Sequence, residues 1–219
     1  MRMLQIPFYD PNKSYEENYD QGPFGAFVDR EVFQQTAEPT EDFLGQKVYL
    51  PFGIPAGPLV NSKFCKSAFE KSFDICVYKT VRSAFYKTHP APNLLSVKVD
   101  GDLTLEKAKG NLLGDTNYTE PLSITNSFGV PSKDPTVWQE DVKKAIEAAG
   151  KGQVLVLSFM GTTLEGQTEE EFIEDWRLTA KLAKENANRE AQLNKRFDSA
   201  KQLIAEAYEK AEAVLRGEN

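Results

Sequence analysis

The sequence has 219 residues, with 33 acidic and 26 basic side chains and a net charge of −7. This acidic balance argues against nucleic acid or an anionic membrane surface as a partner, because both need a basic surface. No apolar run approaches the roughly 18 residues that span a bilayer, and residues 1–10 lack a signal-peptide pattern. A single histidine and two cysteines exclude a His-rich or Cys-rich metal site. So few cysteines fit a reducing, cytoplasmic location best.

Residues 1–42 carry many aromatic side chains without a clear period, and we expect them to form an arm over a domain. Short β-type runs follow at residues 48–50 and 52–54. Asn61 then offers an N-cap for a helix that extends through Phe69. A second strand is expected at residues 73–79. A hairpin is expected at residues 94–105, where apolar residues alternate on both sides of an Asp-Gly turn at 100–101.

The second half continues the alternation of strands and helices. A short strand at residues 122–125 leads into Asn126, and Asp134 precedes a helix with Pro135 at its first position. A buried-type strand at 154–159 is followed by Thr168 and Glu171, which are spaced as a capping box for the next helix. Four strand-then-helix units in series predict a parallel α/β fold.

From residue 186 onward the pattern changes. Apolar residues between Leu193 and Val214 recur at alternating spacings of four and three, which places them on one stripe of a helix. The stripe is compatible with a terminal amphipathic helix that packs on the domain and with a dimerising coiled coil, and both remain open.

Ligands of parallel α/β folds gather at the carboxyl ends of the strands. Here those ends carry small residues, a lysine and amide or hydroxyl side chains, a set that suits a planar anionic ligand such as a flavin or a pyrimidine. The strand ends are 56–57, 79–80, 126–129 and 160–163. Simpler interpretations exist, because Gly57 and Gly129 can serve turns and Cys65 and Cys76 can be small core residues. The role of His89 is open.

Three segments, 52–58, 74–81 and 126–131, together resemble the first half of the dihydroorotate dehydrogenases, which are FMN-dependent (β/α)8 barrels of pyrimidine biosynthesis. The resemblance covers residues 43 to about 185. It implies an α/β fold of the parallel (β/α) barrel type, about half of a TIM barrel, with an N-terminal arm at 1–42 and a C-terminal amphipathic helix at 186–219.

The resemblance also implies roles for single residues. Ala56 and Gly57 would lie against the FMN ring, Lys79 would lie between flavin and substrate, and Thr80 would hydrogen-bond the flavin. The residues expected to line the pyrimidine pocket are Asn126, Ser127, Phe128, Gly129 and Val130. Phe128 stands where methionine is usual in the family and Val130 where leucine is usual, so the pocket wall stays apolar but changes shape.

The family segments that carry the catalytic base and the FMN phosphate site do not appear after Lys184, so no catalytic base and no metal ligand is identified. The expected function is oxidation of dihydroorotate to orotate. The alternative is a non-catalytic, truncated or rearranged barrel fragment that associates through its C-terminal helix. An open half-barrel would expose sheet edges and apolar surface, so a homo-oligomer or a complementing second chain is expected.

Overall fold

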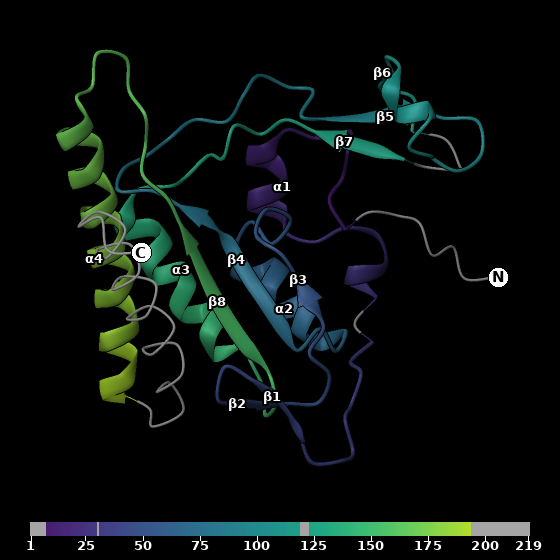
Figure 1. Ribbon diagram of the computed structural model, residues 1–219. Coiled ribbons are helices and arrows are strands. Elements are labelled where there is room, and N and C mark those ends of the chain that lie inside the picture. Colours follow the sequence, from purple (N-terminus) through teal and green to yellow (C-terminus); the bar gives the residue numbers. More distant parts are fainter. Residues whose placement is uncertain (1–7, 30, 119–122, 194–219) are drawn as a thin grey trace. The chain divides into compact units, whose positions relative to one another are not determined.

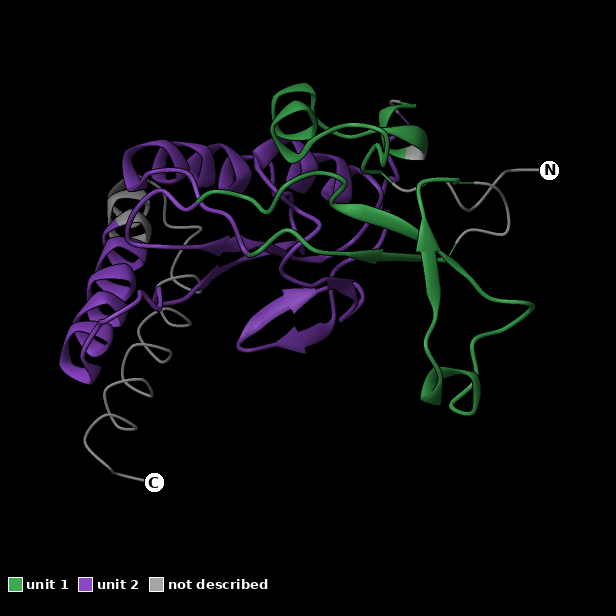
Figure 2. Ribbon diagram, turned by 90° about the horizontal axis from the view of Figure 1, so that it is seen from above, with its two compact units in different colours: residues 1–29, 87–129 green, residues 30–86, 130–219 purple. Residues whose placement is uncertain are grey.

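The computed structural model describes residues 8–29, 31–118 and 123–193 (Figure 1). The chain divides into two compact units (Figure 2). Unit 1 takes residues 1–29 and 87–129, and unit 2 takes residues 30–86 and 130–219. Each unit is therefore assembled from two separate stretches of sequence, and the expected arm at residues 1–42 contributes to both.

A three-stranded parallel sheet forms the centre of unit 2. Its order is β3-β4-β8, with strands β3 (Gly53–Ile54), β4 (Ile75–Val81) and β8 (Val154–Phe159). β4 and β8 stay in register from the pair Ile75 and Val154 to the pair Tyr78 and Leu157, and the register shifts before Val81 pairs with Phe159. These parallel strands, linked through helices, confirm the α/β class. The half-barrel stays a prediction.

Two helices lie between the strands of this sheet in the chain, α2 (Ser62–Glu70) and α3 (Pro135–Glu147), and a third, α4 (Glu169–Leu193), follows the last strand. Both α2 and α3 pack against β4 and against each other, and α3 also contacts β8 and α4 (Figure 1). The largest fully buried side chains of this core are Trp138, Tyr78 and Phe64. The apolar faces of the helices are thus buried against the sheet, which is the main source of stability for such layers.

Asp141 of α3 ties three elements together. Its carboxylate accepts hydrogen bonds from the Ser62 amide at 2.7 Å and the Ser62 hydroxyl at 2.6 Å, at the start of α2. It also accepts one from the Tyr78 hydroxyl of β4 at 2.7 Å. The buried phenol of Tyr78 is therefore satisfied, as a buried polar group must be.

The expected helix starts are confirmed. Asn61 is the N-cap of α2 and accepts from the amides of Lys63 and Phe64. Asp134 is the N-cap residue of α3, with Pro135 first in the helix, although its side chain makes no capping bond and accepts instead from the Phe85 amide. Before α4, the Thr168 hydroxyl and the Glu171 carboxylate form the predicted capping box.

Two strand predictions need correction. The expected strand at 48–50 is β2 (Gln46–Val48), which forms an antiparallel hairpin with β1 (Glu41–Phe43). The expected hairpin at 94–105 does not form. Its first arm is β5 (Leu94–Lys98), but this strand pairs with β6 (Leu113–Asp115), which lies beyond the expected second arm. Residues 102–105 form no strand, and Leu103 and Leu105 are exposed.

The third expected parallel strand also has a different place. The strand β7 (Ile124–Asn126) pairs antiparallel with β5, so unit 1 holds an antiparallel sheet of order β6-β5-β7. The segment between β5 and β6 includes a 3-10 turn at Lys107–Lys109. The strand that leads into Asn126 is therefore outside the parallel sheet, and three strands rather than four are parallel in the described part of the chain.

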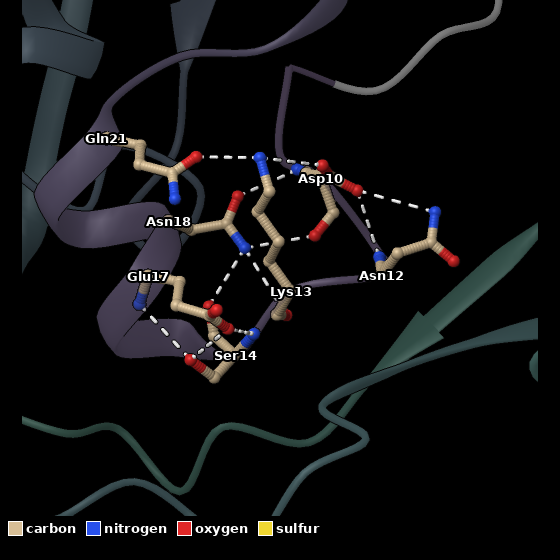
Figure 3. A network of polar contacts seen from close by, with 7 residues as sticks. All are labelled: Asp10, Asn12, Lys13, Ser14, Glu17, Asn18 and Gln21. Carbon is tan, nitrogen blue, oxygen red and sulfur yellow. Dashed lines mark hydrogen bonds and ion pairs between the residues drawn. The ribbon is translucent and has the colours of Figure 1, made fainter.

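Unit 1 also contains a short helix, α1 (Tyr15–Gln21), and a 3-10 turn at Gly25–Val28. A polar network holds the start of α1 (Figure 3). Ser14 and Glu17 form a capping box. The buried Asn18 side chain accepts from the Asp10 amide at 2.8 Å and donates to the Asp10 carbonyl at 3.0 Å. This network folds the chain before α1 back onto the helix.

The long helix α4 continues to Leu193. The expected apolar stripe at residues 193–214 lies, apart from Leu193, outside the described residues. Within residues 8–29, 31–118 and 123–193, no helix combines the length and apolar character that a bilayer span requires.

Candidate functional site

The carboxyl end of β3 presents open backbone. Ala56 and Gly57 lie two and three residues after the end of this strand, and both are exposed. Gly57 has φ +130°, a conformation that side-chain-bearing residues rarely adopt, and no atom lies within 4 Å of where its Cβ would stand. A flat ligand can therefore approach the main chain here without meeting a side chain.

Lys79, near the carboxyl end of β4, is a buried lysine. Only 6% of its surface is exposed, and its amide donates to the Leu59 carbonyl at 3.0 Å. Burial lowers the pKa of its amine from the ordinary 10.5 to about 8, and the nearby positive charge of Arg82 lowers it further in the same direction. The amine is thus a cation held in surroundings that disfavour its charge, which is a feature typical of functional sites.

Thr80 follows Lys79 and connects the two longest parallel strands. Its hydroxyl lies 2.8 Å from the Ser158 hydroxyl of β8. Either hydroxyl can donate in this pair, so each keeps further hydrogen-bonding capacity. The ends of β4 and β8 are therefore linked through polar side chains that can also contact a ligand.

Arg82 organises the loops beyond this edge. Its Nε donates to the Val130 carbonyl, and one terminal nitrogen donates to the Gly161 carbonyl and the Thr162 hydroxyl, all at 3.0–3.1 Å. The guanidinium carbon lies 4.2 Å from the centre of the Tyr86 ring, a cation–π contact. Sequence reasoning did not single out Arg82.

Val130, predicted to line the pyrimidine pocket, is held by this arginine. Its φ is +50°, an unusual value for a β-branched residue. Its side chain is 38% exposed, while its carbonyl accepts from Arg82. The strained backbone is thus fixed by a buried cation.

The other predicted pocket residues form a second group, in unit 1. Asn126 ends β7 and is exposed, as is Ser127. The Ser127 amide donates to the Asn93 carbonyl at 2.8 Å. The ring of Phe128 contacts the rings of Tyr9 and Tyr15 with centroid separations of 5.3 and 5.9 Å. Aromatic residues of the N-terminal stretch therefore pack against a predicted pocket residue.

His89, whose role the sequence leaves open, contacts this second group. Its ring nitrogen Nδ1 lies 3.0 Å from the Ser127 hydroxyl, and its amide donates to the Phe128 carbonyl at 3.0 Å. The pattern of Pro and His at 89–92 gave no indication of this, because the partners lie almost forty residues later in the chain.

The predicted site residues thus fall into two groups. Ala56, Gly57, Lys79, Thr80 and Val130 belong to unit 2, and residues 126–129 belong to unit 1. Each group is locally ordered by hydrogen bonds of its own unit. A single pocket shared by Lys79 and Asn126 stays a prediction.

The structure therefore describes an α/β protein with a parallel sheet whose carboxyl edge carries open backbone and buried cations. No family model matches the chain. The chain is 35% identical over 188 residues to a dihydroorotate dehydrogenase of Dictyostelium discoideum, an alignment that covers 82% of this chain and 50% of that protein.

This similarity supports a relationship of the chain to the dihydroorotate dehydrogenase family. The chain spans about half the length of the curated relative that it matches.

Proposed function

We propose that this chain provides the flavin- and pyrimidine-binding residues of an oxidoreductase that oxidises dihydroorotate to orotate in pyrimidine biosynthesis. The observation that carries the proposal is Lys79: a lysine 6% exposed, beside the carboxyl edge of the parallel sheet, in a chain related to this family. A charge buried at this position is stabilised when an anionic ligand binds next to it.

FMN is the cofactor that we propose, and the residues of unit 2 fit it. The open backbone at Ala56 and Gly57 suits one face of a planar ring. Lys79 would stabilise negative charge on the ring, and Thr80 would offer a hydroxyl to its polar edge. When bound, FMN supplies the hydride-accepting chemistry of the reaction.

The substrate would be a small pyrimidine carboxylate. Asn126 and Ser127 offer an amide and a hydroxyl, which can both donate and accept hydrogen bonds to the ring and carboxylate of orotate. Phe128, Gly129 and Val130 would form the apolar wall and the space beside it. Lys79 would serve substrate and cofactor together.

The first test is FMN uptake by the full-length chain. We expect the purified protein to bind FMN, with quenching of flavin fluorescence and a shifted visible absorbance. Lys79→Met should weaken binding of reduced, anionic FMN by tenfold or more, whereas Lys66→Met, at an exposed lysine of α2, should leave it unchanged. A protein that takes up no FMN would refute the proposal.

Activity is tested separately, with dihydroorotate as electron donor and a redox dye as acceptor. We expect dye reduction that depends on dihydroorotate and that Lys79→Met abolishes. FMN binding without any orotate binding or dihydroorotate-dependent reduction would restrict the proposal to the flavin site.

We further propose that a second copy or a complementing chain joins this one. In the described residues β3 and β8 are the outer strands of a three-stranded parallel sheet, and parallel sheets are usually larger and covered on both faces. Native mass measured with and without FMN tests this proposal, which a strictly monomeric holoprotein would contradict.

The two free, buried cysteines support a reducing, cytoplasmic location.

A further inference from the structure

The segment at residues 88–93 lies against residues 127–129 through main-chain and side-chain hydrogen bonds. The Phe128 carbonyl accepts from both the His89 amide at 3.0 Å and the Thr88 hydroxyl at 3.1 Å. The Asn93 side chain donates to the His89 carbonyl at 2.9 Å and the Ser127 carbonyl at 3.3 Å. These bonds fix the main chain of both segments.

The imidazole of His89 adds two contacts that the main chain cannot make. Its Nδ1 lies 3.0 Å from the Ser127 hydroxyl. The other side of the ring lies over Gly129, where an added Cβ would stand 2.5 Å from ring atoms Cδ2 and Nε2. The ring therefore occupies space that exists only because residue 129 has no side chain.

These contacts restrict the groups that would meet a ligand. A serine hydroxyl rotates freely in water, but a bond to an imidazole nitrogen fixes its direction and leaves its remaining hydrogen-bonding capacity for a ligand. Gly129, at φ +74°, is flexible by nature, and the ring limits the conformations open to it. A site ordered before binding loses less conformational entropy when the ligand arrives.

We infer that His89 is a positioning residue for residues 127–129, and that it holds the Ser127 hydroxyl and the Gly129 backbone in the arrangement that binds the pyrimidine. The ligand part of this inference rests on the proposed function; the ordering part does not.

The ordering is tested by hydrogen exchange on the full-length chain without ligand. His89→Ala should raise amide exchange in residues 126–129 by about fivefold, because it removes the ring from Ser127 and Gly129. His89→Asn, which keeps a polar atom near the Nδ1 position, should restore much of the protection. Lys87→Ala, at an exposed neighbour, is the matched control. Unchanged exchange in His89→Ala would overturn the inference.

A second test uses the close approach of the ring to Gly129. Gly129→Ala should weaken the protection strongly in the unchanged chain, because the new methyl group meets the ring. In a His89→Ala background the same substitution should have a clearly smaller effect, since only the backbone strain remains. Equal effects in both backgrounds would contradict the contact.

The functional part is tested by titrating orotate into the FMN-loaded protein. His89→Ala should raise the Kd for orotate by about fivefold, the loss expected for one hydrogen bond, and His89→Asn should recover most of the affinity. FMN affinity should stay within twofold, because the proposed flavin residues belong to unit 2. Raised exchange in a protein that binds no orotate would support the positioning role and refute the pyrimidine site.

Discussion

Replacing Lys79 by methionine should stabilise the free protein. The side chain is 6% exposed, and burial lowers its pKa from 10.5 to about 8. Since each pKa unit corresponds to about 1.4 kcal/mol, keeping this amine charged in the folded state costs about 3 kcal/mol relative to the unfolded chain. Methionine fills a similar volume without a charge, so Lys79→Met should raise the free energy of unfolding at pH 7 by about 1–3 kcal/mol.

The lowered pKa of Lys79 determines how its contribution to stability changes with pH. Between about pH 8 and pH 10.5 the unfolded chain holds the Lys79 proton and the folded chain has released it. Because the unfolded state then binds more protons, the contribution of Lys79 to stability rises with pH across this window. The advantage of Lys79→Met should therefore be full below about pH 8 and fade above it.

Other buried groups lower the stability of the folded protein as the pH rises through the alkaline range. Burial raises the pKa of the Cys65 thiol well above 9.0 and that of Cys76 to about 12, and burial together with the negative charge of Glu16 raises that of the Tyr9 phenol. Each of these contributions falls as the pH rises past the ordinary pKa of the group. They are common to both proteins, so the difference between variant and unchanged chain reports Lys79 alone.

The assay is urea unfolding of both proteins at intervals from pH 6 to pH 10.5, with Lys66→Met as the control for loss of an exposed lysine. A Lys79→Met protein that is less stable than the unchanged chain at pH 7, or a difference that does not change with pH, would refute the reasoning. With saturating FMN the order should reverse, because FMN stabilises the unchanged chain more strongly.

Two further predictions concern the framework of unit 2. Asp141→Ala should lower the free energy of unfolding by about 3 kcal/mol, because it removes the carboxylate that accepts from Ser62 and from the buried Tyr78 hydroxyl. Urea unfolding measures this loss. An intermediate loss is expected for Asp141→Asn, and no loss would contradict the role of this carboxylate. Thr168→Ala should lower the free energy of unfolding by about 1 kcal/mol, because the α4 cap is lost. Thr168→Ser keeps the hydroxyl and should be as stable as the unchanged chain. A Thr168→Ser protein as destabilised as Thr168→Ala would show that the hydroxyl does not form the cap.

The elements of unit 2 could be predicted because their signals are local. The apolar run Val154–Phe159 coincides with β8, and the N-cap at Asn61 and the capping box at Thr168 depend only on residues within one turn of their helix. Pro135 marks the start of α3 for the same reason. Local chemistry decides each of these starts, so no knowledge of the tertiary structure was needed.

The wrong strand partners have the opposite cause. The alternation at Leu94–Lys98 correctly indicates a strand, and Gly101 does adopt a turn conformation with φ +64°. The strands that pair with β5 lie farther along the chain: β6 begins more than ten residues beyond that turn, and β7 comes later still. Pairing across such distances is decided by tertiary contacts, which a local pattern does not contain.

The site shows the same division. Lys79 could be found because the apolar run at 75–78 indicates a buried strand that carries this lysine. The structure confirms the burial of Lys79, although β4 continues for two residues beyond it. Arg82 and His89 could not, because their sequence neighbourhood reads as loop. Their partners, among them Val130 and Ser127, lie about forty to eighty residues away in the chain.

Lys79 and Arg82 together explain why we propose that this edge of the sheet binds a ligand. Both are almost fully buried, and burial lowers the pKa of each. The Arg82 guanidinium donates to the carbonyls of Val130 and Gly161, and these hydrogen bonds offset the cost of burying its charge. The lowered pKa of Lys79 means that burial disfavours the charged form of its amine in the folded protein. An anion bound beside Lys79 would gain from both cations, and it would remove a folding cost that the free protein carries.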